Sequence, residues 1–575
     1  MIIPEKLKEV EKVKIVIVGG VAGGASAAAR LRRLDEKAEI VMFEKSGYIS
    51  YANCGLPYYI GGEITDSEEL TLQTPQSFNA RFNVDVRVNR EVIDINRQSK
   101  TVTVLKTDSG KTYEESYDKL ILAPGAKPIV PNFPGVENER IFTLRNVEDT
   151  FKIKSFIDEK QPKSAVVIGG GFIGLEMAEN LVSQGIEVTL AEKMPQLLGT
   201  LDSDLASFVH AKFASKGVNL KLGVTVKGFE IRNCKIAVLA DEIPETVADM
   251  VVLALGVTPD SSLASKAGLE LGMKGSIAVN SHMQTSDPDI YAVGDTVEVE
   301  HFVTKQPALI SLAGPANKQG RIAADNIYGI SSVYQGSQGS SVIKLFDMTA
   351  ATTGINEKQA KALGLDYDKV ILSPSSHAGY YPGAKVMTLK VIYEKKTLKI
   401  LGAQIVGSDG VDKRIDVIAV AIRAGLSAIQ LKDLDLAYAP PYSSAKDPVN
   451  MAGFMIENIE NGLVKQFHYD DIAELRNRND CILLDTRTNT EYSRGHAEGF
   501  VHIPVDTLRD RLDELDKSKK VYVMCQSGLR SYIACRILSQ NGYDCYNFSG
   551  GYRLYNSIKN DIVPADKAYP CGMEK

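Results

Sequence analysis

The chain has 575 residues, more than one hydrophobic core usually supports, so its length favours three or four domains. Its net charge of −6 argues against non-specific nucleic-acid binding, and no apolar run is long enough to span a bilayer. The charged first residues contain no signal-peptide core and the seven cysteines lack paired spacing, so we expect a cytoplasmic protein without a disulfide scaffold, metal site or membrane contact.

The first predicted element is an apolar strand beginning at Lys14, which leads into a glycine-rich turn and an Ala-rich helix. In a dinucleotide-binding fold, Gly19 would allow the tight turn and Gly24 the close packing of helix on strand. Val21 departs from this pattern, because a second glycine belongs at its position. The next strand ends in Glu44, an acid placed to accept hydrogen bonds from a ribose.

The same pattern returns 150 residues later, where Gly169, Gly171 and Gly174 satisfy the full glycine spacing. Gly171 would let the backbone approach a pyrophosphate, and the helix N-terminus offers free N–H groups to that anion. Glu192 stands 21 residues after Gly171, where its carboxylate can bind ribose hydroxyls and would repel a 2′-phosphate. NADH is therefore favoured, although Lys193 leaves NADPH open. The alternative, a glycine-rich turn with a solvated glutamate, is disfavoured by the paired copies.

Later strands indicate that the second dinucleotide-binding domain is inserted in the first. Strands ending in small-residue turns follow the two units at 120–125 and 251–256, and a strand at 290–295 returns the chain to the first domain. Gly294 and Asp295 end this returning strand. They place a carboxylate where the ribityl chain of a flavin can be hydrogen-bonded.

We therefore predict an α/β protein with two nested dinucleotide-binding (Rossmann-like) domains, followed by two more domains. Alternating strand patterns and two helical stretches indicate an α+β dimerisation or interface domain, and buried parallel strands among helices indicate a C-terminal α/β domain. The expected boundaries are 12–160 and 276–335 for the first domain, 161–275 for the second, 336–463 for the interface domain and 464–575 for the last.

Up to about residue 463 the chain resembles the two-dinucleotide-fold flavoprotein disulfide reductases. The resemblance implies FAD at the first site and NADH at the second, in a homodimer. The residues it implies are Gly19, Gly20, Ala22, Gly23, Gly24, Glu44, Lys45, Ala123, Gly125, Gly294 and Asp295 for FAD, and Gly169, Gly171, Gly174, Glu192 and Gly256 for NADH.

Cys54 lies in the run Ser50-Tyr51-Ala52-Asn53-Cys54-Gly55-Leu56-Pro57-Tyr58. Tyr59 occupies the place of a C-x₄-C partner, so Cys54 must exchange with a sulfur brought by the substrate or become a sulfenate. Reactivity near neutral pH requires a lowered thiol pKa, which a helix N-terminus or a nearby cation can arrange. The alternative is a small buried apolar cysteine.

Within the family, this run resembles the motif of the coenzyme A-disulfide reductases. The NADH oxidases and peroxidases typically carry a histidine in the first glycine loop, where this chain has Ala22. Carried over from the resemblance, Ser50 and Asn53 would contact the pantetheine arm of coenzyme A.

The first helix supplies candidates for the phosphates of coenzyme A. Ser26, Arg30 and Arg33 share one face by their spacing, and the two arginines could pair with phosphates. The alternative is a solvated basic face that continues through Arg32. The remaining coenzyme A candidates are Asn317 and Lys446.

Reduction of an oxidised thiol also needs a proton donor for the leaving thiolate. Glutathione-type reductases use a C-terminal histidine with a carboxylate four residues on, whereas His377 here lacks that spacing. By resemblance, Tyr380 and Tyr438 would reach the flavin site of the partner subunit and assist the thiol chemistry. Packing at the interface is the alternative for both tyrosines.

The C-terminal domain resembles a rhodanese, with a six-residue cradle from Cys525 to Arg530. Inward-pointing backbone N–H groups and a helix dipole would stabilise a thiolate or persulfide at Cys525, and Arg530 can hold an anionic sulfur donor. Asp485, Arg487 and His496 occur in rhodanese order and are interpreted as structural.

Together these features predict an enzyme that passes electrons from NADH through FAD and Cys54 to a sulfur–sulfur bond. The rhodanese-like domain indicates a sulfane bond, with coenzyme A persulfide or polysulfide as oxidant and Cys525 receiving or delivering sulfane sulfur. Such delivery requires that the Cys525 loop face the Cys54 entrance or swing to it near Leu463. Three alternatives stay open: coenzyme A-disulfide reduction for thiol redox buffering, oxygen reduction through a sulfenate, and a flavin-bound redox sensor. The sequence also leaves open the physiological oxidant and whether sulfur moves within one subunit.

Overall fold

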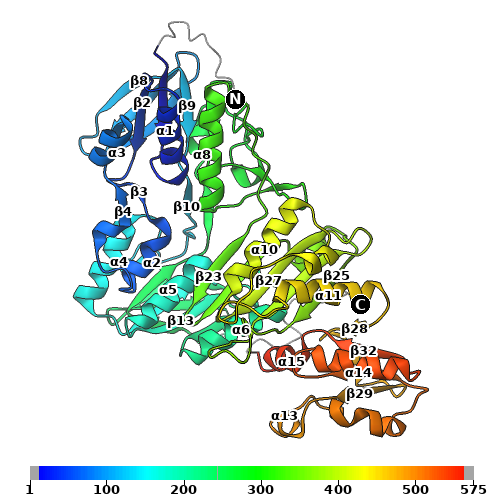
Figure 1. The fold of residues 1–575 in the computed structure, drawn as a ribbon. Helices are drawn as coiled ribbons and strands as arrows, with labels where there is room; N and C mark the ends of the chain where they lie inside the picture. Colours follow the sequence, from blue (N-terminus) through cyan, green and yellow to red (C-terminus); the bar gives the residue numbers. More distant parts are fainter. Residues whose placement is uncertain (1–11, 242–243, 562–575) are drawn as a thin grey trace.

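Four five-stranded sheets organise the computed structural model, which describes residues 12–241 and 244–561 (Figure 1). Three of these sheets are parallel and one is antiparallel. Helices cover them, so the predicted α/β class with two nested nucleotide-binding units is confirmed. The two nucleotide-binding units are called the first unit and the second unit. The antiparallel sheet with its helices is called the interface domain, and the last parallel sheet with its helices the C-terminal module.

The first unit has a parallel sheet in the order β20-β9-β1-β2-β5. Its strands are β1 (Lys14–Val18), β2 (Glu39–Glu44), β5 (Asp85–Val88), β9 (Lys119–Leu122) and β20 (Ile290–Ala292). Its helices are α1 (Ala22–Leu34), α2 (Leu56–Ile60), α3 (Pro75–Phe82) and α8 (Ala313–Ile327). Smaller strands are β3 (Ile49–Tyr51), β4 (Thr71–Gln73), β6 (Arg90–Asn96), β7 (Thr101–Lys106), β8 (Thr112–Ser116), β21 (Val299–Glu300) and β22 (Pro307–Ala308). Helices α1 and α8 lie side by side (Figure 1), and a Cβ on Gly320 would lie 2.3 Å from the carbonyl oxygen of Gly23.

The second unit repeats this design in the order β11-β18-β12-β13-β14. Its strands are β11 (Ile141–Thr143), β12 (Ser164–Ile168), β13 (Glu187–Glu192), β14 (Asn219–Leu222) and β18 (Met250–Leu253), with a meander of β15 (Val226–Arg232), β16 (Lys235–Ala240) and β17 (Thr246–Ala248). Its helices are α4 (Val147–Lys160), α5 (Phe172–Ser183) and α6 (Ser203–Ser215). Helix α7 (Ser262–Lys266) packs against β6, and its Leu263 and Ala264 join the core of the first unit. The parallel pairing of β11 with β18 places residue 141 in this sheet, ahead of the boundary expected at residue 161, because so short a strand shows no periodicity in the sequence.

The interface domain has an antiparallel sheet in the order β23-β24-β27-β26-β25. Its strands are β23 (Ser341–Leu345), β24 (Met348–Gly354), β25 (Tyr367–Leu372), β26 (Thr388–Glu394) and β27 (Ile400–Gly407). Its helices are α9 (Glu357–Ala362), α10 (Val411–Ala424) and α11 (Pro448–Glu460).

The C-terminal module has a parallel sheet in the order β28-β32-β31-β29-β30. Its strands are β28 (Lys465–Phe467), β29 (Cys481–Asp485), β30 (Val501–His502), β31 (Lys520–Met524) and β32 (Cys545–Phe548). Its helices are α12 (Asp471–Leu475), α13 (Asn489–Ser493), α14 (Leu529–Gln540) and α15 (Gly551–Lys559). Residues 562–575, which are expected to belong to this domain, lie outside the described residues.

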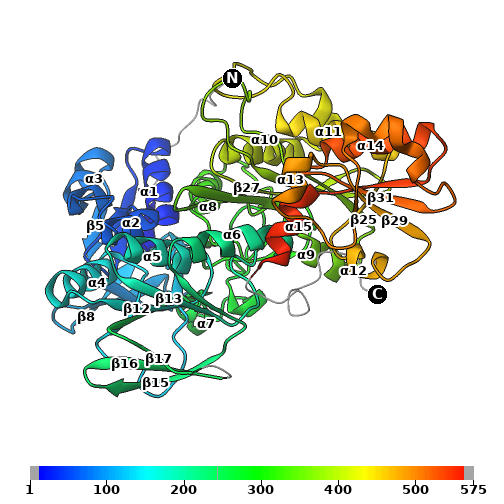
Figure 2. The same cartoon turned by 90° about the horizontal axis from the view of Figure 1, so that it is seen from below.

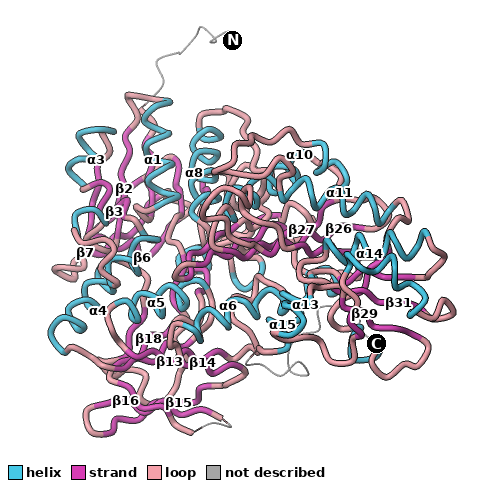
Figure 3. Tube along the Cα trace, turned by 60° about the horizontal axis from the view of Figure 1, so that its bottom comes forward, coloured by secondary structure: helices cyan, strands magenta, loops and turns pink. Residues whose placement is uncertain are grey.

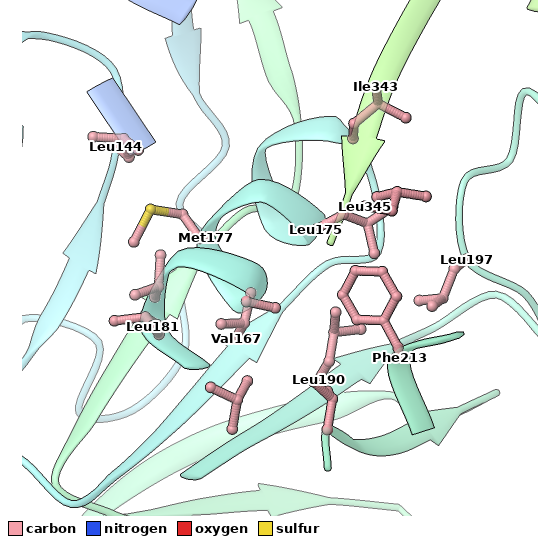
Figure 4. Packing of buried hydrophobic residues seen from close by; sticks show 14 of the residues in the cluster. Leu144, Val167, Leu175, Met177, Leu181, Leu190, Leu197, Phe213, Ile343 and Leu345 are labelled. Atoms are coloured by element: carbon pink, nitrogen blue, oxygen red, sulfur yellow. The ribbon is translucent and has the colours of Figure 1, made fainter. Parts of the chain in front are cut away.

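One hydrophobic core continues from the second unit into its neighbours. Leu175 and Met177 of α5 pack in the same cluster as Ile343 and Leu345 of β23 (Figure 4). Leu56 of α2 belongs to this cluster as well. All five side chains are at most 2% exposed. Burial of this much apolar surface stabilises the arrangement, so α5 holds α2, and with it the Cys54 segment, against the second unit.

The C-terminal module docks on the second unit through helices. Figures 2 and 3 show α15 beside α6, and the contacts between these two helices agree. In Figures 1 and 2 the module lies apart from α2, with parts of the second unit and the interface domain between them. Within one chain the module therefore does not face the Cys54 segment, which differs from the first of the two arrangements expected for direct delivery. In the part of the chain that the structure describes, no helix is long and apolar enough to cross a membrane.

Candidate functional site

The first glycine-rich turn is formed where β1 ends and α1 begins. Gly19 has φ +98°, and a Cβ there would lie 2.1 Å from the carbonyl oxygen of Ala123, so a side chain is excluded. A Cβ on Gly24 would lie 1.9 Å from the carbonyl oxygen of Gly19. The N–H of Gly20 donates to Glu44 Oε2 at 2.9 Å. These contacts fix a tight turn beside a buried carboxylate.

The second glycine-rich turn has nearly the same geometry. Gly169 has φ +114°, and a Cβ there would lie 2.2 Å from the carbonyl oxygen of Ala254. A Cβ on Gly174 would lie 1.9 Å from the carbonyl oxygen of Gly169, and the N–H of Gly170 donates to Glu192 Oε2 at 2.6 Å. The tandem copies therefore share their glycine contacts as well as their sequence.

Both turns leave a helix N-terminus open to an anion. The N-cap residue is Val21 in α1 and Gly171 in α5, and at neither position does a capping side chain accept a hydrogen bond from the helix. Neither helix has an acidic residue in its first turn. A Cβ on Gly171 would meet no atom within 4 Å, so backbone and open space adjoin there. These features fit the pyrophosphate groups of FAD at the first turn and of a nicotinamide dinucleotide at the second.

The remaining predicted cofactor residues frame the two turns. Gly125 and Gly256, both with positive φ, flank the antiparallel strands β10 (Ala126–Pro128) and β19 (Val257–Pro259) that join the two units. The N–H of Gly294 donates to the Gln319 side chain at 2.7 Å. Lys45 Nζ lies 3.8 Å from Asp260 Oδ2 at the surface. Ala22 and Gly23 begin α1.

Arg145 pairs with Asp295, a contact that sequence reasoning missed. Arg145 Nη2 donates to Asp295 Oδ2 at 2.9 Å, and both side chains are half-buried. Arg145 precedes α4, 150 residues before its partner, so no local pattern could connect them. The pair fixes the carboxylate that was predicted to bind a ribityl chain.

Cys54 lies in a short 3₁₀ helix (Asn53–Gly55) that leads directly into α2. Its side chain is exposed. Even so, partial burial raises the pKa of the Cys54 thiol, the carboxylates of Glu176 and Asp295 raise it further, and Arg145 opposes them. Arg145 is a nearby cation that lowers this pKa in the expected direction, but burial and the two carboxylates outweigh it.

Glu176 is a second group near Cys54 that sequence reasoning missed. Burial and, to a smaller extent, the Glu179 carboxylate raise the pKa of Glu176 to about 7, against a hydrogen bond from Tyr58 that lowers it. A carboxyl group that titrates near neutral pH can hold or release a proton. Its position in the first half of α5, two residues after Gly174, was the available signal in the sequence.

The predicted coenzyme A residues fall into three groups. Ser50, with φ +44°, donates its N–H to the carbonyl oxygen of Gly20 at 2.8 Å, and the adjacent Asn53 is exposed next to Cys54. Ser26 of α1 donates to Asn317 of α8. In the first pair, Asn53 thus lies beside Cys54 and Ser50 lies against the first glycine turn. The second pair lies at the α1–α8 contact, and the basic residues form the third group.

The basic residues of α1 do not form one solvated face. Arg30 donates to Asp325 of α8 at 2.6 Å, whereas Arg33 is exposed. Arg32 is buried and donates to five backbone carbonyls, those of Asp35, Glu36, Ala38, Phe82 and Asn83. The alternative of a basic face running through Arg32 is therefore wrong. Lys446 is exposed ahead of α11, in the interface domain.

Tyr380 and Tyr438 meet on the surface of the interface domain. Their hydroxyl oxygens lie 2.9 Å apart, and the side chains are 76% and 47% exposed. The hydrogen bond to Tyr380 raises the pKa of Tyr438, so the Tyr438 phenol remains protonated at neutral pH and can donate. Two adjacent exposed phenols form a polar pair that a second subunit or a substrate could contact.

Cys525 follows β31 and is fully buried. Its Sγ accepts hydrogen bonds from the Gly528 N–H at 3.1 Å and from the Ser531 hydroxyl at 3.2 Å. Gly528 has φ +97° at the N-cap of α14, a conformation that favours glycine and turns its N–H toward the sulfur. This is a donor-lined cradle for a thiolate or a persulfide.

Arg530 is held by Glu491. Two of its nitrogens donate to the two carboxylate oxygens at 2.7 Å each, and this pairing lowers the pKa of Glu491 to about 2. Glu491 therefore occupies two of the five N–H donors of Arg530 and competes with an anionic sulfur donor for this side chain.

Two residues interpreted as structural are buried together. Asp485 and Arg487 form an ion pair at 2.8 Å with both side chains at most 1% exposed. His496 stacks on Tyr492 at 4.0 Å between ring centroids. In the described part of the chain no group of His, Cys, Asp or Glu residues could hold a metal ion.

Comparison with known families agrees with the order of the domains. Residues 13–320 match the family of pyridine nucleotide-disulphide oxidoreductases, residues 340–448 match the dimerisation domain of that family, and residues 468–557 match the rhodanese-like domain.

Individual relatives match over most of the chain. A coenzyme A disulfide reductase of Staphylococcus haemolyticus is 37% identical over 447 residues, which is 78% of this chain and all of that protein. The crystal structure of reduced CoADR-RHD from Bacillus anthracis has a TM-score of 0.93 at 50% identity, covering 96% of this chain and 100% of that chain. An NAD-dependent persulfide reductase from A. fulgidus has a TM-score of 0.89 at 39% identity, covering 94% and 100%.

Proposed function

This chain belongs to the pyridine nucleotide-disulphide oxidoreductases, and we propose that it uses NADH and FAD to reduce sulfane sulfur bonds through Cys54. Coenzyme A persulfide and polysulfide are the proposed oxidants, and Cys525 supplies sulfane sulfur. The observation that carries the proposal is that one chain holds two cysteines in surroundings suited to different steps of sulfur chemistry. An exposed Cys54 stands in the reductase part, and a buried Cys525 with two hydrogen-bond donors stands in the rhodanese-like part.

The protein supplies two places for cofactors. FAD would be held by the first glycine turn, Glu44 and Asp295, and NADH by the second turn and Glu192. Bound FAD supplies the transfer of an electron pair from a nicotinamide to a thiol–disulfide system. Glu192 would repel a 2′-phosphate, which supports NADH over NADPH.

Cys54 acts as the nucleophile in the proposed reaction. Its thiolate attacks the inner sulfur of coenzyme A persulfide, so a Cys54–coenzyme A mixed disulfide forms and sulfide leaves. Two electrons then break this disulfide and return the Cys54 thiolate and the coenzyme A thiolate, which takes up a proton. Overall, one NADH and one proton convert one persulfide to one coenzyme A thiol and one hydrogen sulfide, with NAD⁺ as the other product.

Three observations support a substrate-borne second sulfur. The next cysteine along the chain is Cys234, exposed in the turn between β15 and β16. Asn53 is exposed beside Cys54, and the half-buried Ser50 lies four residues before it, so a pantetheine arm could approach there. Tyr380 and Tyr438 offer hydroxyls for the leaving thiolate, and we propose that they act across a homodimer formed by the dimerisation domain.

A second candidate function is reduction of coenzyme A disulfide alone. It is favoured by the name and 37% identity of the relative that matches 78% of this chain. That relative is covered completely by 447 residues, whereas the family match of the rhodanese-like domain accounts for residues 468–557. The extra domain is what favours a sulfane oxidant in this protein.

Steady-state NADH oxidation with four oxidants tests the proposal. The purified holoenzyme is assayed side by side with coenzyme A persulfide, polysulfide, coenzyme A disulfide and oxygen, and sulfide is quantified. We expect the highest kcat/KM with the persulfide and one sulfide per NADH. A higher kcat/KM with coenzyme A disulfide would support the second candidate instead, and a higher one with oxygen would contradict both.

A further inference from the structure

The second glycine-rich turn rests on a strained loop between β13 and α6. The N–H of Leu198 donates to the carbonyl oxygen of Gly170 at 2.8 Å, and a Cβ on Gly170 would lie 2.6 Å from Leu197 Cδ2. Leu198 has φ +50°, a left-handed conformation that leucine rarely adopts. Such a conformation persists only where the surrounding contacts impose it. The shape of the turn therefore depends on the hydrogen bonds that hold residues 197 and 198.

His210 of α6 provides one of these hydrogen bonds. The N–H of Leu197 donates to His210 Nε2 at 3.0 Å, and both side chains are at most 1% exposed. Because Nε2 accepts, the proton of a neutral imidazole must lie on Nδ1. A buried N–H that loses this acceptor would carry the cost of desolvation without a hydrogen bond to offset it.

Asp561, just beyond the end of α15, faces the other nitrogen of the same imidazole. His210 Nδ1 lies 2.8 and 2.9 Å from the two carboxylate oxygens of Asp561. The carboxylate accepts from Nδ1–H, so it selects the tautomer whose Nε2 can accept from Leu197. Without this carboxylate, the imidazole can carry its proton on Nε2. The Nε2–H and the N–H of Leu197 would then face each other as two donors without an acceptor.

Helix α15 connects this contact to the cradle of Cys525. At its start, the N–H of Tyr552 donates to the carbonyl oxygen of Cys525 at 2.7 Å and that of Arg553 to Gln526 at 3.2 Å. Near its end, Ser557 Oγ lies 2.7 Å from Ser207 Oγ of α6. One helix of nine residues thus contacts the sulfur-carrying loop at one end and the second unit at the other (Figure 2).

We propose that α15 is a rigid support, which we call the strut, between the docked C-terminal module and the second unit. Through it the module positions the second glycine-rich turn, with His210 and Asp561 as the positioning residues. The module then contributes to NADH binding as well as to sulfur transfer. The inference rests on the proposed function, because it takes the second turn as the NADH site. Neither residue contacts the dinucleotide in this account; both act through Leu197 and Leu198.

Binding of NAD⁺ to the FAD-loaded enzyme tests the strut. NAD⁺ is titrated by calorimetry into wild type, Asp561→Leu, Asp561→Asn and Ser557→Ala. Loss of one buried hydrogen bond predicts about tenfold weaker binding to Asp561→Leu. Asp561→Asn keeps a neutral acceptor and should recover most of the affinity. Ser557→Ala removes one docking contact between α15 and α6 but keeps the hydrogen bonds from Asp561 through His210 to Leu197, so its affinity should fall much less than that of Asp561→Leu.

Hydrogen exchange supplies a readout that loss of docking alone would not produce. The amides of Leu197 and Leu198 should exchange faster in Asp561→Leu than in wild type and should stay unchanged in Ser557→Ala. Equal NAD⁺ affinity and equal exchange in Asp561→Leu and wild type would overturn the inference. If Asp561→Leu does not fold, His210→Ala takes its place, and unchanged affinity there overturns the inference as well.

Failure of the proposed function gives a different result. A wild-type holoenzyme that shows no saturable binding of NAD⁺ would overturn the assignment of the second site. Saturable binding in wild type that is insensitive to Asp561→Leu would leave that assignment intact and remove only the strut.

Discussion

The two cysteines that carry the proposed chemistry have opposite surroundings. Cys54 is exposed, and the Glu176 and Asp295 carboxylates raise the pKa of its thiol in addition to its partial burial. Cys525 is fully buried, and its sulfur accepts two hydrogen bonds. An exposed sulfur can react with a bulky substrate, whereas a sulfur enclosed by donors can hold a small anionic group. The difference supports the proposed division between reduction at Cys54 and storage at Cys525.

Removal of the Cys54 sulfur should have the largest effect. Cys54→Ser should retain FAD and its reduction by NADH, but turnover with every disulfide or persulfide should fall by at least about a thousandfold, because the nucleophile is lost. Flavin absorbance, anaerobic reduction by NADH and steady-state assays measure this. Persulfide reduction that survives in this variant would place the chemistry elsewhere.

The tyrosine pair should have a smaller effect on the same site. Tyr438→Phe removes a hydroxyl that lies 2.9 Å from that of Tyr380, and should slow oxidation of the reduced enzyme by substrate about tenfold, since phenylalanine cannot donate a proton. Stopped-flow traces separate this half-reaction from flavin reduction by NADH, which should not change. An unaltered rate of oxidation by substrate would contradict proton donation by Tyr438 and leave packing at the interface as its role.

Glu176 allows the surroundings of Cys54 to be tested through the pH dependence of its thiol. Its carboxylate raises the pKa of Cys54, so Glu176→Gln should move the pH dependence of Cys54 alkylation to lower pH. Glu176, with a pKa of about 7, is partly ionised at neutral pH, so the shift should be seen most clearly above pH 7. Rates with a small alkylating agent report the change, measured in a Cys234→Ser background because Cys234 is exposed as well. A shift to higher pH would contradict the assigned electrostatics.

The preference for NADH over NADPH should give the smallest effect among the tests of the reductase part of the chain. Wild type should show a higher kcat/KM with NADH than with NADPH, because the proposed role of Glu192 at the ribose would make its carboxylate repel a 2′-phosphate. The N–H of Gly170 fixes this carboxylate at 2.6 Å. Parallel assays with the two dinucleotides give the ratio. A ratio that favours NADPH would refute the role given to Glu192.

Local sequence patterns predicted the glycine turns well because each turn is fixed by contacts that only glycine allows. Gly24 and Gly174 have the same 1.9 Å close approach, so the repeat in the sequence corresponds to a repeat in the structure. The motif around Cys525 could also be predicted from the sequence, since its hydrogen-bond donors come from residues 528 and 531 of the same loop and helix.

Groups brought together by tertiary packing could not be predicted in this way. Arg145 meets Asp295 across 150 residues, and Glu491 occupies Arg530 across 39. The net pKa shift at Cys54 includes a contribution from Glu176, which α5 brings to the first unit. Docking of α15 on α6 likewise has no local signature, because it joins residues more than three hundred positions apart.

A comparison of two substrates in Cys525→Ser tests the central claim, that Cys525 supplies sulfur and Cys54 reduces it. Sulfur transfer that depends on thiosulfate should be abolished, and polysulfide reduction should fall at least about tenfold. Reduction of ready-made coenzyme A persulfide should stay within about twofold of wild type, because that substrate can reach the exposed Cys54 directly. Equal losses with both substrates, or no loss with either, would contradict the division between the two sulfurs.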